Sequence, residues 1–240
     1  MERPQMILFD YGQTLIAEES YDGYRGFVAL MPYVCSNPCG HTARDVADAE
    51  AEIYHALGRD DPEMRIARPL EVHMHLYNRF VFEYLDMELS ITPAEAERIF
   101  WDAAALGRAV EGIEELLSWL WAQGFRTGVI SNLSYSGQAL KERIDRILPK
   151  HHFEFILASS EHVFRKPSPY IFQLALKKAR LAAPQVWFCG DNFACDVEGA
   201  HAVGMVPVWF KPGAAVPPKA DFAYLHVRRW RELQAALAAL

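Results

Sequence analysis

The sequence lacks the features that direct a chain into a membrane or out of the cell. No apolar run approaches the roughly 20 residues that a membrane-spanning helix needs. The first five residues, Met-Glu-Arg-Pro-Gln, lead directly into an apolar run and do not have the form of a signal peptide. We therefore expect a cytoplasmic protein with no membrane partner.

The sequence is also short of positive charge. It holds 24 Lys and Arg against 31 Asp and Glu, which gives a formal net charge of −7, and the basic residues are scattered. Proteins that bind nucleic acid or an anionic membrane usually gather positive charge into a patch. The composition therefore favours neither a nucleic-acid partner nor a membrane surface.

Cysteine is rare, with four residues at Cys35, Cys39, Cys189 and Cys195. Without a secretion signal, reduced thiols are expected rather than disulfides. The run from Cys35 through Cys39 to His41 holds three possible zinc ligands at an irregular spacing, which disfavours a zinc site. In contrast, 51% of the residues are hydrophobic, enough to bury a sizeable core in 240 residues.

Short apolar runs rich in β-branched and aromatic residues alternate with helical patterns. This alternation predicts an α/β fold with a parallel sheet and right-handed crossovers. The expected strands are residues 6–9, 127–131, 155–158, 186–189 and 206–210, with a weaker candidate at 222–224. Helical periodicity between them predicts helices that begin near Ile113, Pro169 and Leu233.

One long interval interrupts the alternation, because no convincing strand lies between Leu15 and Ala109. Helical patterns cover residues 45–57, 70–85 and 93–106 instead. A structureless connection of this length would be unusual. We therefore predict a core domain of residues 1–16 and 107–240, with residues 17–106 inserted as a helical domain. His73 and His75 are two residues apart and are expected on different faces of one helix.

Polar segments follow four of the expected strands. The first is Asp10-Tyr11-Gly12-Gln13-Thr14 and the second is Ser131-Asn132; the third surrounds Lys166, and the fourth is Gly190-Asp191 with Asp196 five residues later. In this order, the segments resemble the four motifs of the haloacid dehalogenase (HAD) superfamily, subfamily I with a helical type-1 cap. The resemblance implies a Rossmann-like, doubly wound parallel sheet with an inserted α-helical cap, and it implies a hydrolase.

The resemblance also implies roles in phosphate chemistry. Asp10 would be the nucleophile, attacking a phosphomonoester to form an aspartyl-phosphate. Lys166 would supply a fixed positive charge, and Ser131 and Asn132 would donate hydrogen bonds to the phosphoryl oxygens. Asp10, Lys166 and Ser131 are therefore the expected catalytic residues. Substrate binding is expected from Ser131, Asn132, Lys166, Gly12 and Thr14, with Thr14 orienting the Asp10 loop.

A Mg²⁺ cofactor is expected for the same reason. Mg²⁺ prefers hard oxygen ligands, and a cluster of carboxylates is repulsive without a cation. The expected ligands are Asp10, the carbonyl of Gly12, Asp191 and Asp196, the last directly or through a water. The expected partner is a small phosphorylated metabolite, and the chain is expected to be a monomer or a homodimer.

Gly12 departs from the family pattern, which usually has a second Asp at this position. In the phosphatases that Asp is the general acid/base, a role typically worth ~10²–10⁴ in rate. One interpretation is a phosphatase that acts on good leaving groups or uses another acid; His73, His75, Glu18 and Glu19 are candidates. Branches of the superfamily with a similar first motif are regarded as phosphatases.

Two other interpretations remain open. A dehalogenase would use Asp10 to attack carbon, but such enzymes typically have an aromatic residue in place of Gly12 and Ser-Asn in the fourth motif. The chain has Gly190-Asp191 there, which favours phosphate. The other interpretation is a binding or regulatory protein that holds a phosphorylated ligand and has lost turnover.

Overall fold

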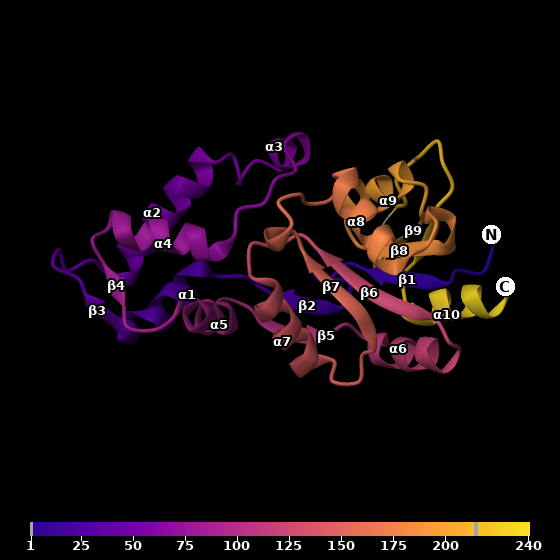
Figure 1. Cartoon of the computed structure of the whole chain (residues 1–240), viewed down its shortest axis with the longest axis horizontal. Helices are drawn as coiled ribbons and strands as arrows, with labels where there is room; N and C mark the ends of the chain where they lie inside the picture. The colour runs from indigo at the N-terminus through magenta and orange to yellow at the C-terminus, as the bar shows by residue number, and fades with distance from the viewer. Residues whose placement is uncertain (1, 214–215) are drawn as a thin grey trace.

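Six parallel strands form the central sheet of the computed structural model (Figure 1). The structure describes residues 2–213 and 216–240, except for the side chain of Glu19. The order of these strands in the sheet is β10-β9-β8-β1-β6-β7. The bounds are β1 Met6–Phe9, β6 Arg126–Ser131, β7 Phe153–Ala158, β8 Val186–Gly190, β9 Val206–Phe210 and β10 Leu225–Val227. The predicted α/β class and parallel sheet are confirmed.

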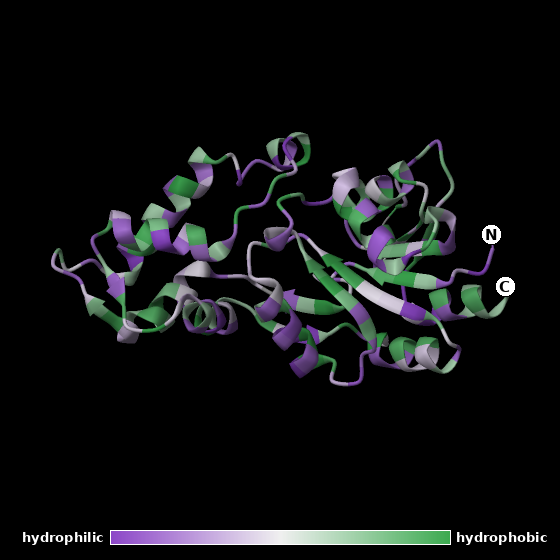
Figure 2. Ribbon diagram, viewed as in Figure 1, coloured by the Kyte–Doolittle hydropathy of each residue, from purple (hydrophilic) through white to green (hydrophobic). Residues whose placement is uncertain are grey.

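Helices cover both faces of this sheet. The helices are α6 Ile113–Ala122, α7 Gly137–Ile147 and α10 Trp230–Ala238 on one face, and α8 Pro169–Ala179 and α9 Gly199–Ala202 on the other. Alternate residues of β1 divide between the two apolar clusters: Ile7 and Phe9 join the first, and Met6 and Leu8 the second. A strand buried on both faces has a continuous apolar sequence, as the green strands of Figure 2 show.

The order of the strands puts β1 at the point where the chain changes direction across the sheet. From β1 the chain passes to β6 and β7 on one side, and later to β8, β9 and β10 on the other. In open α/β sheets, ligands bind beyond the carboxyl ends of the strands at such a switch point. Asp10 follows directly after β1 and so lies at this place.

Residues 23–104, which we call the helical insert, form a separate group of helices to the left of the sheet in Figure 1. Its helices are α1 Gly23–Leu30, α2 Ala43–Ala56, α3 Pro62–Ala67, α4 Met74–Tyr84 and α5 Pro93–Ala104. Capping boxes at Thr42 and Thr92 fix the starts of α2 and α5. Helices α1 and α5 pack closely, with the rings of Phe27 and Phe100 at 4.9 Å.

Four short strands contradict the prediction that no strand lies between Leu15 and Ala109. Strands β2 Ile16–Glu19 and β5 Leu106–Ala109 pair antiparallel where the chain enters and leaves the insert. Strands β3 Val34–Ser36 and β4 Glu88–Leu89 pair within it. Each strand has only two to four residues, and each pair joins segments more than fifty residues apart. The local sequence therefore has no pattern that would predict these strands.

Other element predictions need smaller corrections. The helix predicted over residues 70–85 begins only at Met74, and α3 and α7 were not predicted. The weak strand candidate at 222–224 lies just before β10; Phe222 instead stacks on His201, with ring centroids 3.8 Å apart. Four turns of 3-10 or π type complete the described elements: Met31–Tyr33, Ser159–Glu161, Ala183–Gln185 and Phe193–Glu198. Within the described residues, no helix is long and apolar enough to cross a membrane.

Candidate active site

A buried lysine joins two carboxylates at the carboxyl edge of the sheet. Lys166 Nζ lies 2.6 Å from Asp10 Oδ1 and 2.7 Å from Asp196 Oδ1. Asp10 follows β1, Lys166 lies in the loop between β7 and α8, and Asp196 lies in the π turn after β8. All three side chains are buried. The structure thus brings together three of the predicted site residues from segments far apart in the sequence.

The charges in this group determine one another's protonation. Burial raises the pKa of Asp10 to about 7, against the opposing effect of Lys166 and with a smaller raising effect of Asp196 and Asp191. Burial disfavours the charged form of Lys166, but Asp10 and Asp196 outweigh it and raise the pKa of this lysine above its ordinary value. Lys166 is therefore a fixed cation beside Asp10.

Asp191 is held by residues of the next strand. Lys211 Nζ lies 3.2 Å from Asp191 Oδ2, and the indole of Trp209 donates to the main-chain carbonyl of Asp191 at 3.0 Å. Burial raises the pKa of the Asp191 carboxyl, as does the charge of Asp196. Lys211 was not predicted, although it directly follows the predicted strand 206–210 and so had to lie at the same edge of the sheet.

Asp10, Asp191 and Asp196 form the one group in the described part of the chain that could hold a metal ion. One oxygen of each carboxylate lies within 4.8 Å of the others. Three carboxylate oxygens are hard ligands of the kind that Mg²⁺ prefers, and their mutual repulsion makes a cation favourable here. The donor set therefore fits the expected magnesium ion.

The two residues of the second segment differ in their surroundings. Ser131 ends β6, is buried, and borders a cavity of about 340 Å³ at the sheet edge, which we call the edge cavity. Asn132 borders it too, but its side-chain amide is engaged with the main chain of Lys166. It donates to the carbonyl at 2.8 Å and accepts from the amide at 2.7 Å. Asn132 therefore also fixes the loop that carries Lys166.

The family described as haloacid dehalogenase-like hydrolase matches residues 5–204. The chain belongs to this family. The match covers β1 and the segments that carry Asp10, Ser131, Lys166 and Asp191, and the predicted membership of the HAD superfamily is confirmed.

Two curated relatives of this HAD-like hydrolase match about half of it. One is the human haloacid dehalogenase-like hydrolase domain-containing protein 3, 34% identical over 46% of this chain and 43% of the relative. The other is a glyceraldehyde 3-phosphate phosphatase of Pyrococcus abyssi, 36% identical over 44% of each chain. The chain thus spans less than half the length of either relative.

A solved structure covers nearly the whole HAD-like hydrolase. It is a 2-haloacid dehalogenase from Pseudomonas syringae pv. Tomato DC3000, with a TM-score of 0.66 and 20% identity over 98% of this chain and 99% of that chain. At this identity the likeness shows the fold and does not extend to the reaction.

Gly12 and Thr14 of the first motif take different positions in this HAD-like hydrolase. Gly12 borders the edge cavity, and a Cβ built on it would meet no heavy atom within 4 Å among the described residues. Thr14 is fully buried and does not border the cavity, and its hydroxyl has no hydrogen-bond partner in residues 2–213 and 216–240. Its position does not support a direct contact with substrate.

The candidates for a replacement acid are mostly remote from the edge cavity. Glu18 borders it, but Glu18 Oε1 accepts from the Tyr11 hydroxyl at 2.8 Å and the Trp101 indole at 3.1 Å. His73 and His75 do not border it. The side chain of Glu19 lies outside the described part of the structure.

The prediction that His73 and His75 diverge on one helix is wrong. His73 caps α4 from outside, accepting from the amide of His75, and the two rings lie 4.6 Å apart. His75 Nε2 instead lies 3.1 Å from Glu97 of α5. Both imidazoles therefore serve contacts within or beside the insert.

The helical insert closes over the edge through buried carboxylates. Glu71 pairs with Arg59 and, at 3.2 Å, with Arg165, and it accepts from the Ser159 hydroxyl at 2.9 Å. Glu97 accepts from the Ser136 amide and hydroxyl, each at 2.6 Å. Arg165 is the neighbour of Lys166, so one of these contacts ties the insert to the loop that carries Lys166.

Proposed function

We propose that this HAD-like hydrolase is a Mg²⁺-dependent phosphatase that acts on a small phosphorylated metabolite through an aspartyl-phosphate at Asp10. The observation that carries the proposal is the group of three carboxylates, with Lys166 paired to two of them, at the switch point of the sheet. The phosphatase name of the Pyrococcus abyssi relative supports the same reaction class.

Asp10, Asp191 and Asp196 would hold the magnesium ion, with the Gly12 carbonyl as a further predicted ligand. When bound, the ion neutralises negative charge on the phosphoryl group and on the carboxylate that attacks it. Asp10 must react as the carboxylate, and its raised pKa shows that burial opposes that form. The positive charges of the site therefore have to compensate for the desolvation of the nucleophile.

The remaining residues bind and orient. Asp10 forms a bond to phosphorus while the ester oxygen leaves. Lys166 stabilises the charge on Asp10 and the phosphoryl oxygens, and the hydroxyl of Ser131 donates to one of those oxygens. Asn132 positions Lys166 through two hydrogen bonds to its main chain. Its predicted hydrogen bond to the phosphoryl group would be a second role. A water then hydrolyses the aspartyl-phosphate.

The absence of an acid at Gly12 restricts the substrates of such an enzyme. No described side chain that borders the edge cavity replaces the acid of the missing Asp. The carboxyl of Glu18 borders the cavity, but it already accepts hydrogen bonds from Tyr11 and Trp101. A poor leaving group would then depart without protonation, which lowers the rate. Phosphate esters with good leaving groups are the substrates expected to turn over.

Two alternatives make different demands on the same residues. A dehalogenase would need no metal carboxylates, whereas Asp191 and Asp196 are both present beside Asp10. A binding protein without turnover would retain the metal and phosphate contacts, and the loss of the acid at Gly12 favours it. Turnover of an activated substrate separates these alternatives from a phosphatase.

The test is hydrolysis of p-nitrophenyl phosphate and acetyl phosphate with and without Mg²⁺. Both have good leaving groups and need no acid. We expect Mg²⁺-dependent release of phosphate by the intact protein and none above background from Asp10→Asn. Full activity in Asp10→Asn would show that another residue is the nucleophile. No turnover of either compound, with retained phosphate binding, would favour the binding protein.

A further inference from the structure

A second cavity of about 600 Å³ lies beside the edge cavity, under the helical insert. Its lining includes Tyr21, Glu50, Tyr54, Arg65, Tyr77 and Tyr135, and we call it the insert cavity. It shares Arg65, Asn132, Leu133, Tyr135 and Arg165 with the edge cavity, so the two adjoin. A phosphate ester with its phosphoryl group at Asp10 would extend its organic part into this space.

The size and walls of the insert cavity favour a sizeable apolar or aromatic body. Cavities of roughly 300–1,000 Å³ with mainly apolar walls bind drug-sized ligands, and a three-carbon alcohol would leave most of this one empty. Four tyrosines line it, and Tyr54 and Tyr77 meet edge to face with ring centroids at 6.2 Å. Tyrosine rings present flat apolar surfaces with a polar tip, which suits a ring-bearing ligand.

Most of the charges around the insert cavity are already paired. Glu71 pairs with both Arg59 and Arg165, and Asp60 pairs with His55 at 2.7 Å. Arg65 of α3 differs, because its guanidinium makes no hydrogen bond or ion pair within residues 2–213 and 216–240. Since Arg65 also borders the edge cavity, its charge faces the end of the ligand that carries the phosphate.

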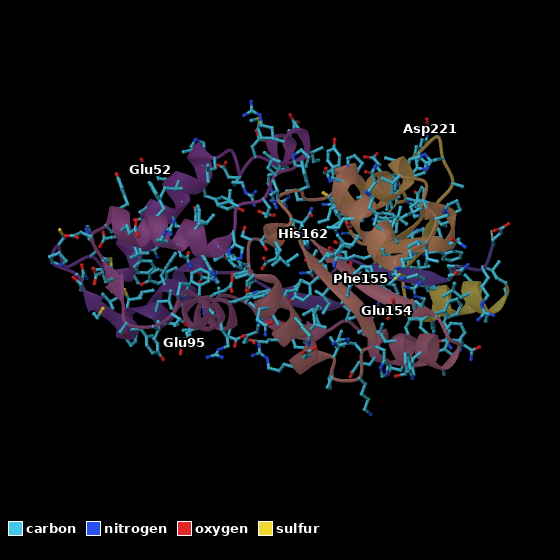
Figure 3. All side chains as sticks on the ribbon, viewed as in Figure 1. Glu52, Glu95, Glu154, Phe155, His162 and Asp221 are labelled. Atoms are coloured by element: carbon cyan, nitrogen blue, oxygen red, sulfur yellow. The ribbon has the colours of Figure 1, made fainter. Side chains whose placement is uncertain are left out.

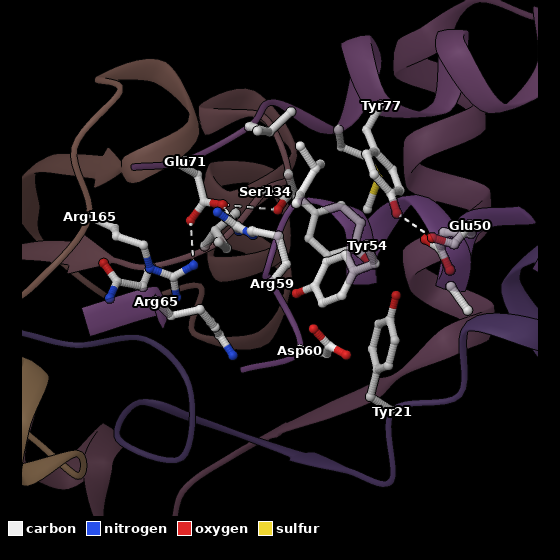
Figure 4. Close-up of a pocket in the computed structure, with 17 residues that line it drawn as sticks. Tyr21, Glu50, Tyr54, Arg59, Asp60, Arg65, Glu71, Tyr77, Ser134 and Arg165 are labelled. Carbon is white, nitrogen blue, oxygen red and sulfur yellow. Dashed lines mark hydrogen bonds and ion pairs between the residues drawn. The ribbon is translucent and has the colours of Figure 1, made fainter. Parts of the chain in front are cut away.

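Glu50 of α2 is the unpaired charge of the opposite sign. It borders the insert cavity but not the edge cavity, and Figure 4 shows it across the tyrosines from Arg65. In the described part of the chain its carboxyl has no hydrogen-bond or ion-pair partner. The nearby Tyr77 hydroxyl donates to the main-chain carbonyl of Glu50, at 2.6 Å, and not to its side chain. Burial raises the pKa of the Glu50 carboxyl to about 7.

An unpaired carboxyl that is partly buried is costly unless something in the cavity pairs with it. An ammonium group would supply both an opposite charge and hydrogen-bond donors. A carboxylate or a second phosphate in the same place would be repelled. The opposite charges at the two ends therefore set the direction of the ligand, with its phosphate toward Arg65 and its donor toward Glu50.

We propose that Glu50 selects a substrate that is the phosphate ester of an alcohol with an aromatic or apolar body and an amino group remote from the phosphate. The proposal rests on the phosphatase function proposed above and names its substrate class. Hydrolysis breaks the bond between phosphorus and the ester oxygen; water supplies the new oxygen of inorganic phosphate and the proton of the released amino alcohol.

The test compares two probes of nearly equal shape, tyramine O-phosphate and 4-propylphenyl phosphate, which has a methyl group in place of the ammonium. Binding to Asp10→Asn in the presence of Mg²⁺ is measured by calorimetry, so that the result does not depend on turnover. We expect at least about tenfold tighter binding of the amine. In Asp10→Asn with Glu50→Gln, the ratio of the two affinities should fall to about one.

The control is Asp10→Asn with Glu52→Gln. Glu52 lies on the same helix but on its outer, exposed side, away from both cavities (Figure 3). The Glu52→Gln substitution should leave the ratio of the two probe affinities as it is in Asp10→Asn alone. Equal affinities for the two probes, or a preference that persists after Glu50→Gln, would overturn the proposal. Binding of inorganic phosphate by each variant checks that the site is folded.

Hydrolysis of the two probes by the intact protein separates this proposal from the one on which it rests. Both probes are aryl phosphates, whose phenolate leaves more readily than an alkoxide and less readily than p-nitrophenolate. A tenfold binding preference without Mg²⁺-dependent turnover of either probe or of p-nitrophenyl phosphate would sink the phosphatase and keep Glu50 as the selector of an aminated ligand. Turnover of both probes at equal kcat/KM, with equal affinities, would keep the phosphatase and sink the role of Glu50.

Discussion

Gly12 is the residue at which this HAD-like hydrolase differs most from a complete phosphatase site. It borders the edge cavity next to Asp10, and its backbone does not adopt the left-handed conformation that would require glycine. A side chain built on it would meet no described heavy atom within 4 Å of its Cβ. Neither packing nor backbone conformation therefore prevents an Asp side chain at position 12.

Gly12→Asp is expected to raise turnover of an alkyl phosphate such as glycerol phosphate by ~10²–10⁴, because it restores a group that can protonate the leaving oxygen. The gain on p-nitrophenyl phosphate should be much smaller, since its leaving group needs no proton. Steady-state kinetics with Mg²⁺ measure both. Gly12→Asn is the matched control, having the same shape and no proton to transfer. Equal gains in the two variants would exclude proton transfer as the cause.

At the residue scale the sequence predicts well which charged residues gather at the carboxyl edge of the sheet, and it predicts the insert cavity poorly. Asp10, Lys166 and Asp191 each follow a recognisable strand, and parallel strands bring their carboxyl ends together. Glu50 and Arg65 lie on ordinary helices among other charged residues. Their common feature is the lack of a partner, which depends on side-chain packing across the insert and has no local signature.

Among the elements, α7 has a role that the sequence did not suggest. Its Arg143 is buried and donates to the Tyr11 hydroxyl and to Asp102 of α5, each at 2.9 Å, and it lies 3.2 Å from Glu18 of β2. One side chain thus joins α7, the loop after β1, the entry strand of the insert and its last helix. The position of the insert over the edge depends on this guanidinium.

Arg143→Gln is expected to lower the free energy of unfolding by about 1–3 kcal/mol, because it leaves the Tyr11 hydroxyl and the Ala105 carbonyl without their buried donor. Arg146→Gln is the control: Arg146 also pairs with Asp102, at 2.5 Å, but it is exposed. An exposed pair contributes at most about 1 kcal/mol. Urea unfolding followed by circular dichroism compares the two variants. Similar losses in both would contradict the central role of Arg143.

The difference between predicted and observed elements follows from burial and distance. Strands β1, β8 and β9 are covered on both faces, so their sequences are continuous apolar runs that stand out without a partner. Strand β2, with two glutamates in four residues, exists because β5 pairs with it from nearly ninety residues away. A pairing of this kind depends on where the insert packs, which the local sequence does not contain.

On the scale of the whole molecule, ligand binding and stability should be coupled across the two parts. The edge cavity is bordered by Asp10, Lys166 and Asp191 from the sheet and by Arg65 and Trp101 from the insert. A ligand bound there contacts both parts at once. It therefore stabilises the closed arrangement as well as the fold, by an amount that depends on its concentration relative to its dissociation constant.

Mg²⁺ with inorganic phosphate, at about 100 times the dissociation constant, should raise the free energy of unfolding by about 2.7 kcal/mol. For a chain of this size, that corresponds to an increase of about 5–10 °C in Tm, measured by calorimetry. Asp191→Asn should lose most of the increase because it removes a carboxylate of the metal group. Asp221→Asn, at an exposed position remote from the cavity (Figure 3), should keep it. A full increase in Asp191→Asn would contradict the assignment of Mg²⁺ to this group, which is the one arrangement of acidic residues, histidines and cysteines in the described residues that could hold the ion.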